Sequence, residues 1–165
     1  MDNLLDKEAV KRVQESLNSF DVSLKAQVLE QSARTAKDAA TALRCEVGAI
    51  VKSLLLKAED EFILCLVSGD KKCSLNKVKK LTGKKDVCMA NAEDVKKKTG
   101  FTIGGVSPVG LTNNLDIMID GQLNRFQDIF AAAGHPNVVF KINFKNLKEI
   151  TKGVILDISE WDSPQ

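Results

Sequence analysis

Three features of the sequence carry residue types that could do chemistry on a small ligand. Lys52 lies inside the apolar stretch IVKSLLL (50–56), a glycine-rich stretch TIGGVSPVG spans residues 102–110, and His135 lies in AAAGHPN (131–137). A buried ammonium without a counter-charge is costly, so an anionic ligand or a developing oxyanion would account for Lys52. Paired glycines let a backbone approach a ligand and point N–H groups at it. We therefore expect the Lys52 ammonium at the floor of a small cavity, facing the main-chain donors of the glycine stretch.

Each of these features also has an ordinary structural explanation. A lysine near a strand end can reach solvent along its alkyl stem. Adjacent glycines followed by proline are typical of a tight turn, and a loop histidine is often satisfied by water or backbone groups. Taken singly, the three features favour these structural explanations, and only their combination indicates a site.

Common catalytic motifs are missing from the chain. There is no GxxxxGK[ST] phosphate loop, no HExxH, no GxSxG and no GxGxxG after a strand. The four cysteines lie at 45, 65, 73 and 88, and their spacing matches no zinc pattern. We expect free, reduced thiols, no metal and no cofactor. A cysteine hydrolase that pairs Cys73 or Cys88 with His135 is a remote alternative.

Charge is unevenly distributed along the chain. The formal net charge is +2, yet residues 71–98 hold ten lysines against three acidic residues, a local charge of +7. Such a segment suits a polyanion that is bound at one side of the protein. The candidate contacts for such a polyanion are Lys71, Lys72, Lys77, Lys80 and Lys84. An ordinary solvated lysine-rich surface remains the alternative.

The elements that must position these residues are short and mixed. Apolar spacing predicts a helix over about 7–18, and a capping pattern at Thr35 predicts another. Two apolar runs, 48–56 and 62–67, predict a central antiparallel hairpin. Further helices are predicted to begin at Ser74, Asn91 and Asn143, and further strands at 86–90, 115–120, 128–134, 137–142 and 154–159. The sum is an α+β fold with seven or eight strands and five helices in one domain, residues 1–165.

Several local expectations complete this description. Alternation predicts a strand over 22–29, and the helix from Ser74 is expected to direct Leu75, Val78 and Leu81 inward. Residues 160–165 are expected to form a loose tail, with the packing of Trp161 back onto the domain as the alternative. The N-terminus carries acidic residues early and has no apolar signal region, and no apolar run approaches the ~20 residues of a membrane span, so a cytoplasmic location is expected.

Six stretches, in this order, resemble the YbaK/prolyl-tRNA-synthetase-associated editing domain family. They are TAKDAATAL, GAIVKSLLL, FILCLVSGD, TGFTIGGVSPVG, LDIMID and AAAGHPNVVFKINFKNLKEIT, and together they span roughly residues 32 to 158. The most specific signal is the lysine in an apolar strand combined with a GGxSPxG loop some fifty residues later. The resemblance implies one mixed α/β domain around a curved sheet of about seven strands.

The resemblance also implies a function and a set of site residues. Such proteins are free-standing deacylases that hydrolyse the ester between a wrongly attached small amino acid and the terminal adenosine of a tRNA, in many cases proline tRNA. Lys52 matches the family lysine near the terminal ribose and phosphate, and Ser53 follows it. Gly104 and Gly105, with Val106, Ser107 and Pro108, match the loop that contacts the ester. Gly134 and His135 match a position that bears on which amino acid is accepted.

The implied chemistry agrees with the absence of a strong nucleophile. An aminoacyl ester is already activated, and the neighbouring ribose hydroxyl can position or activate water, so the protein supplies orientation, oxyanion stabilisation and a cavity of restricted size. The expected partners are aminoacyl-tRNA and an aminoacyl-tRNA synthetase, with no membrane. An inactive tRNA- or nucleotide-binding module of the same fold stays open as the alternative.

Overall fold

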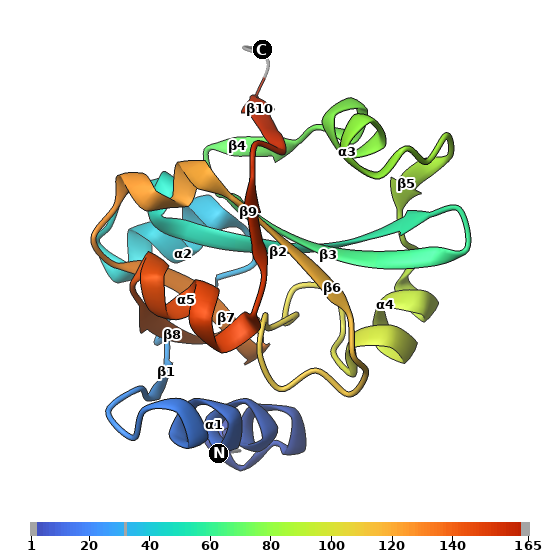
Figure 1. The fold of residues 1–165 in the computed structure, drawn as a ribbon. Helices are drawn as coiled ribbons and strands as arrows, with labels where there is room; N and C mark the ends of the chain where they lie inside the picture. Colours follow the sequence, from blue (N-terminus) through green and yellow to red (C-terminus); the bar gives the residue numbers. More distant parts are fainter. Residues whose placement is uncertain (1–2, 32, 163–165) are drawn as a thin grey trace.

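A computed structural model describes residues 3–31 and 33–162, and its centre is a curved mixed sheet (Figure 1). Seven strands follow one another in the order β1-β8-β7-β2-β3-β6-β9, β5 also pairs with β2, and β4 and β10 form a separate two-stranded sheet. The strands are β1 (Ala26–Val28), β2 (Ile50–Ala58), β3 (Glu61–Ser68), β4 (Lys71–Cys73), β5 (Val87–Met89), β6 (Asp116–Asp120), β7 (Ile129–His135), β8 (Val138–Ile142), β9 (Val154–Leu156) and β10 (Ser159–Trp161). The predicted α+β class with a curved sheet is confirmed.

Five helices surround the sheet: α1 (Glu8–Phe20), α2 (Ala36–Leu43), α3 (Leu75–Thr82), α4 (Ala92–Thr99) and α5 (Phe144–Thr151). Four of them begin at the predicted caps, because a side-chain oxygen at each N-cap accepts a main-chain N–H of the first turn. These N-caps are Thr35, Ser74, Asn91 and Asn143. In Figure 1, α1 lies at one end of the sheet and the β4–β10 pair at the other. Every helix among the described residues is too short or too polar to cross a bilayer.

The predicted hairpin is the centre of the fold. β2 and β3 pair in antiparallel register from Val51 opposite Ser68 to Ala58 opposite Glu61. The β3 residues from Ile63 to Ser68 are all buried, which agrees with a strand that is covered on both faces.

The neighbour of β2 on its other side changes along the strand. β7 pairs with Ile50 and Val51, whereas β5 pairs with residues 56–58. Within the described chain, residues 52–55 of β2 thus have no strand beside them on this side. The sheet contains a gap here, and the backbone of β2 forms one wall of it.

Three local expectations were wrong. The strand predicted over 22–29 is limited to β1, and Val22 is 72% exposed, because the chain pairs with β8 only at residues 26–28. Leu81 is 47% exposed rather than inward, since Val78 alone among the residues of α3 is buried. The expected loose tail contains β10, whose Trp161 pairs with Lys71. Residues 163–165 of that tail lie outside the described residues.

A buried carboxylate fastens the C-terminal segment to the sheet. Asp120 is fully buried at the end of β6, and its oxygens accept from the Ile158 N–H at 3.0 Å and the Ser159 hydroxyl at 2.7 Å. Asp120→Ala leaves both donors without this partner, so we expect the free energy of unfolding to fall by about 3 kcal/mol. Urea denaturation measures the change. An Asp116→Ala control, on the exposed end of the same strand, should leave the midpoint almost unchanged, and an equal loss in both variants would contradict this role.

Candidate active site

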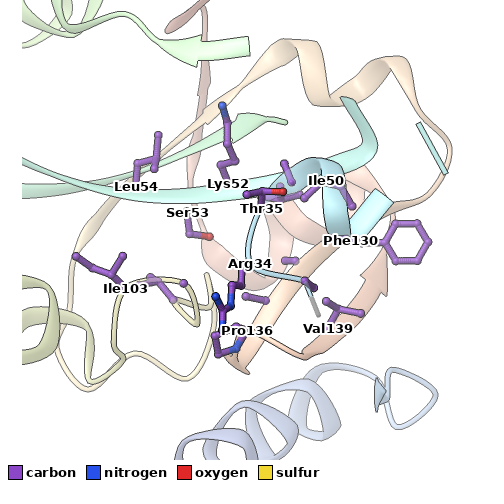
Figure 2. Close-up of a pocket in the computed structure, with 18 of the residues that line it drawn as sticks. Arg34, Thr35, Ile50, Lys52, Ser53, Leu54, Ile103, Phe130, Pro136 and Val139 are labelled. Atoms are coloured by element: carbon purple, nitrogen blue, oxygen red, sulfur yellow. The ribbon is translucent and has the colours of Figure 1, made fainter. Parts of the chain in front are cut away.

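The gap beside β2 opens into a cavity of about 360 Å³. Its walls come from the segment before α2, from β2, from the β5–α4 connection, from the glycine-rich loop and from β7 and β8. The side chains around it are mainly apolar, and Figure 2 shows Ile50, Leu54, Ile103, Phe130 and Val139 among them. A concave, mostly apolar cavity with a few polar groups is typical of a small-ligand site.

Lys52 and Ser53 both line the cavity with part of their atoms, but their side chains point to opposite faces of β2. In Figure 2, the Ser53 hydroxyl lies on the side of Arg34 and Pro136, whereas the Lys52 ammonium points away from them. The Lys52 Nζ donates to the carbonyl oxygen of Lys71, in β4. The expectation that this ammonium faces the glycine loop across the cavity was therefore wrong for this conformation, because strand alternation sends residue 52 to the other face.

The Lys52 ammonium nevertheless has an unusual environment. It is half-buried, and burial lowers the pKa of Lys52 below its ordinary value, against the opposing effect of Asp162 and Asp70. Within the described residues, no carboxylate lies close enough to form an ion pair with it. A cation held in this way beside the open edge of β2 is suited to meet an anion that enters the gap.

Ser53 brings three polar groups to the cavity. Its Oγ is buried and has no hydrogen-bond partner among the residues that the structure describes. Consecutive residues of an antiparallel strand direct their N–H and C=O groups to opposite sides, and the Leu55 carbonyl accepts from Ala90 N–H at 2.9 Å on the gap side. Two residues earlier, Ser53 must direct its own N–H and C=O into the gap as well. Ser53 therefore presents three polar groups to the cavity, namely its hydroxyl and the N–H and C=O of the free strand edge.

The glycine-rich loop supplies one wall through Gly104 and Val106. Gly104 has a φ of +94°, a conformation that glycine adopts without strain. The Gly105 N–H donates to the Thr102 carbonyl at 3.0 Å, so it is already used within the loop. In the described chain, the N–H groups of Gly104 and Val106 have no such partner. Together with the N–H of Ile103, which also lacks a partner among the described residues, these are the available main-chain donors of the loop at the cavity, rather than the amide of Gly105.

Gly105 has a packing role that the sequence did not reveal. A Cβ at this position would lie 3.0 Å from both Cα and N of His135. The loop thus lies directly against the end of β7. This contact fixes where the wall at Gly104 stands relative to β2.

The remaining predicted residues lie behind the cavity wall. Ser107 is fully buried and its Oγ accepts from Val109 N–H at 3.1 Å, while Pro108 is buried and faces a separate surface depression. Gly134, with a φ of +93°, lies against the backbone of α1 at a bulge of β7. The His135 Nδ1 accepts from Asn137 N–H at 3.0 Å. Ser107, Pro108, Gly134 and His135 thus lie close to the cavity but do not line it. Their roles stay predictions.

Sequence reasoning missed three residues at the cavity rim. Arg34 is exposed, lies beside Pro136 in Figure 2, and has no hydrogen bond or ion pair within residues 3–31 and 33–162. Ile103 and Met89 are large apolar side chains that are 62% and 51% exposed. Arg34 directly precedes the predicted helix cap, and Ile103 directly precedes the glycine pair, so proximity in sequence to the predicted features was the available signal.

The predicted basic contacts are not equivalent. Lys71 is only 6% exposed, with its Nζ 3.6 Å from the ring centroid of Trp161. Lys72, Lys77 and Lys84 form ion pairs with Glu160, Asp157 and Glu61, respectively, whereas Lys80 is exposed. The same basic segment contains α4, which reaches the cavity through Val95 and carries two exposed lysines. They are Lys96 and Lys97.

The structure does not assemble the alternative cysteine–histidine pair. Cys73 packs against the buried cluster that contains Cys65, and Cys88 is exposed on β5 opposite Lys57, while His135 is engaged with Asn137. In the part of the chain that is described, no three His, Cys, Asp or Glu side chains gather as a metal site would require.

Residues 30–150 match the profile of the aminoacyl-tRNA editing domain. The "uncharacterized protein YwhH" of Bacillus subtilis is 33% identical over 136 residues, which cover 81% of this chain and 86% of that protein. The proline–tRNA ligase of Caldicellulosiruptor bescii is 30% identical over 136 residues, and there the match covers 82% of this chain but 23% of the ligase.

A crystal structure described as that of a candidate trans-editing enzyme for prolyl tRNA synthetase superposes with a TM-score of 0.88 at 38% identity, covering 93% of this chain and 98% of that one. The curved α+β sheet and the cavity beside β2 together define a class of small domains. The chain belongs to the aminoacyl-tRNA editing domain family. The family expected from the six sequence stretches is confirmed.

Proposed function

We propose that the protein is a deacylase that hydrolyses the ester bond between a wrong small amino acid and a tRNA. The preferred tRNA is proline tRNA. Water adds to the ester carbonyl, and the products are the free amino acid and a tRNA with an intact terminal ribose. The main support is the cavity at the gap beside β2, where free main-chain groups and an unmatched hydroxyl surround an apolar space. A tRNA substrate also accounts for the proposed cytoplasmic location.

The polar groups of the cavity fit the parts of an aminoacyl ester. The Ser53 carbonyl can accept from the substrate ammonium, while its Oγ and the N–H of Gly104 can donate to the ester oxygen. Donors that are fixed before the reaction stabilise charge without reorganisation. The substrate ribose hydroxyl activates the water, so no protein nucleophile is needed.

The size and lining of the cavity support a small amino acid. Its volume is near the lower end of the ~300–1,000 Å³ that is usual for small-molecule sites. Ala33, Ala36, Ala131 and Ala132 line it together with branched apolar residues. We propose that the exposed side chains of Ile103 and Met89 at the rim contact the terminal adenine, which leaves the inner part for the amino acid.

Arg34 is the proposed contact for the terminal phosphate. Its guanidinium is at the rim, and a charge-assisted hydrogen bond to phosphate is stronger than a neutral one. Arg34→Ala should raise KM about tenfold, or roughly 1.4 kcal/mol, and should lower the slope of log KM against log salt by about 0.7. Lys37→Ala, an exposed cation on α2, is the matched control. Equal KM values for both variants would contradict the assignment.

A panel of charged tRNAs tests the proposed function itself. Proline tRNA carrying alanine, serine, threonine, cysteine, 2-aminobutyrate or proline is incubated with the protein, and remaining ester is measured over time. We expect faster loss of at least one small amino acid than without protein, with proline spared. Tight binding of uncharged tRNA with no cleavage of any ester would instead identify a binding module. If the protein neither binds uncharged tRNA nor cleaves any of the esters, both the deacylase and the binding module are overturned.

A further inference from the structure

Two thiols share the face of the sheet that the cavity does not use. Cys65 pairs with Leu54 across the hairpin, and paired residues point to the same face, as do residues two apart on one strand. Cys65 therefore lies on the face of Lys52, opposite to Ser53. It is fully buried in a cluster against which Cys73 packs.

The two cysteines differ in access. Cys65 is fully buried, whereas Cys73, which packs against the cluster that contains Cys65, is only partly buried. An oxidant can thus reach Cys73 first, and the second thiol, that of Cys65, is buried. A partly accessible thiol next to a second thiol is the usual arrangement of a redox-active pair.

The surroundings favour the thiolate form of Cys73. The hydrogen bond from Cys65 lowers the pKa of Cys73, and the nearby Lys52 ammonium lowers it further, although burial and the carboxylates of Asp120 and Glu160 oppose the effect. The same hydrogen bond and burial raise the pKa of Cys65. Cys73 is therefore the nucleophile of the pair, since the thiolate is the reactive form.

We propose that Cys73 and Cys65 are a site of reversible oxidation by hydroperoxides, with Cys73 as the attacked and Cys65 as the resolving thiol. The Cys73 thiolate attacks one peroxide oxygen and the O–O bond breaks, which gives a sulfenic acid and, after protonation, water or an alcohol. The Cys65 thiol then attacks the sulfenic sulfur and releases a second water. Two thiols are oxidised to one disulfide, and one peroxide is reduced.

The disulfide would fix β4 to β3. The Lys52 ammonium donates to the Lys71 carbonyl of β4, so oxidation constrains the segment that holds this ammonium and removes the Cys73 thiolate beside it. The inference rests on the packing of Cys73 against the buried cluster that contains Cys65, and it holds whether or not the protein cleaves aminoacyl-tRNA.

Peptide mapping of the full chain tests the proposal. After treatment with a small excess of hydrogen peroxide, we expect the loss of two of the four thiols, a Cys65–Cys73 peptide under non-reducing conditions, and recovery with dithiothreitol. Titration of the remaining thiols gives the count. A disulfide that involves Cys88 or Cys45 instead, or retention of all four thiols, would overturn the proposal.

Variants separate the two roles. Cys65→Ala removes the resolving thiol, so a sulfenic acid at Cys73 should become trappable by dimedone, whereas the wild type should give little adduct. Lys52→Met should slow disulfide formation several-fold. Cys88→Ser is the matched control and should form the Cys65–Cys73 disulfide at the wild-type rate. Dimedone labelling of Cys88 rather than Cys73 in the Cys65→Ala variant would contradict the assignment.

Discussion

Replacing Lys52 with alanine should lower kcat/KM for the best mischarged tRNA by about a hundredfold, as is typical when one fixed charge-stabilising group is removed. The ammonium is half-buried and forms no ion pair with a carboxylate of the described residues, and it belongs to the part of β2 that has no strand on the gap side. We propose that the flexible lysine side chain turns around this open edge toward the phosphate or the ester oxygen when substrate binds. Burial in the free protein lowers the cost of leaving its present position, since the charge is poorly solvated there.

The control is Lys57→Ala, which removes an exposed lysine further along the same strand. It should retain wild-type kcat/KM. Lys52→Met separates catalysis from packing, because methionine keeps much of the length without the charge. If Lys52→Met lowers only the denaturation midpoint and leaves kcat/KM unchanged, the lysine merely braces β2 against β4, and the catalytic assignment is wrong.

The second large effect is expected for Gly105→Ala. The added Cβ would lie 3.0 Å from Cα and N of His135 and 3.1 Å from the Gly134 carbonyl carbon, and none of these backbone atoms can move easily. The loop must therefore shift away from β7 and carry the Gly104 N–H with it. A displacement approaching 1 Å can cost about a hundredfold in rate, so we expect kcat/KM to fall by about tenfold to a hundredfold.

Gly121→Ala is a suitable control for this change. Its Cβ would have only Ile155 Cγ2 near it, at 3.8 Å. Steady-state deacylation and a melting curve are measured for both variants. Wild-type kcat/KM in Gly105→Ala would show that the position of the loop does not set the rate, and would remove the main-chain donors from the proposed mechanism.

Local patterns in the sequence determined most of the fold. The four capping residues begin their helices as predicted, because each cap hydrogen bond links residues only three positions apart. The apolar runs on either side of residues 57–61 similarly determine the central hairpin. Where solvent and distant partners decide the outcome, the patterns failed. Leu81 has the spacing of a buried residue, but 47% of it stays exposed to solvent.

The sequence also determined which segments form the site. The stretches around Lys52, Gly104 and His135 do meet, although they are far apart along the chain. Their residue types and order were sufficient to indicate the family, since the fold that brings them together is shared with it.

Only the tertiary structure decided which atoms face the cavity. Because side chains alternate along a strand, Lys52 and Ser53 point to opposite faces of β2. Which of these faces borders the cavity is decided only by the packing of β4 on one face and of the glycine-rich loop on the other. The gap beside β2 depends on where β7 and β5 stop pairing, and those contacts join residues that are 29 or more positions apart. No local pattern encodes such a boundary, because it results from the competition of several strands for one edge.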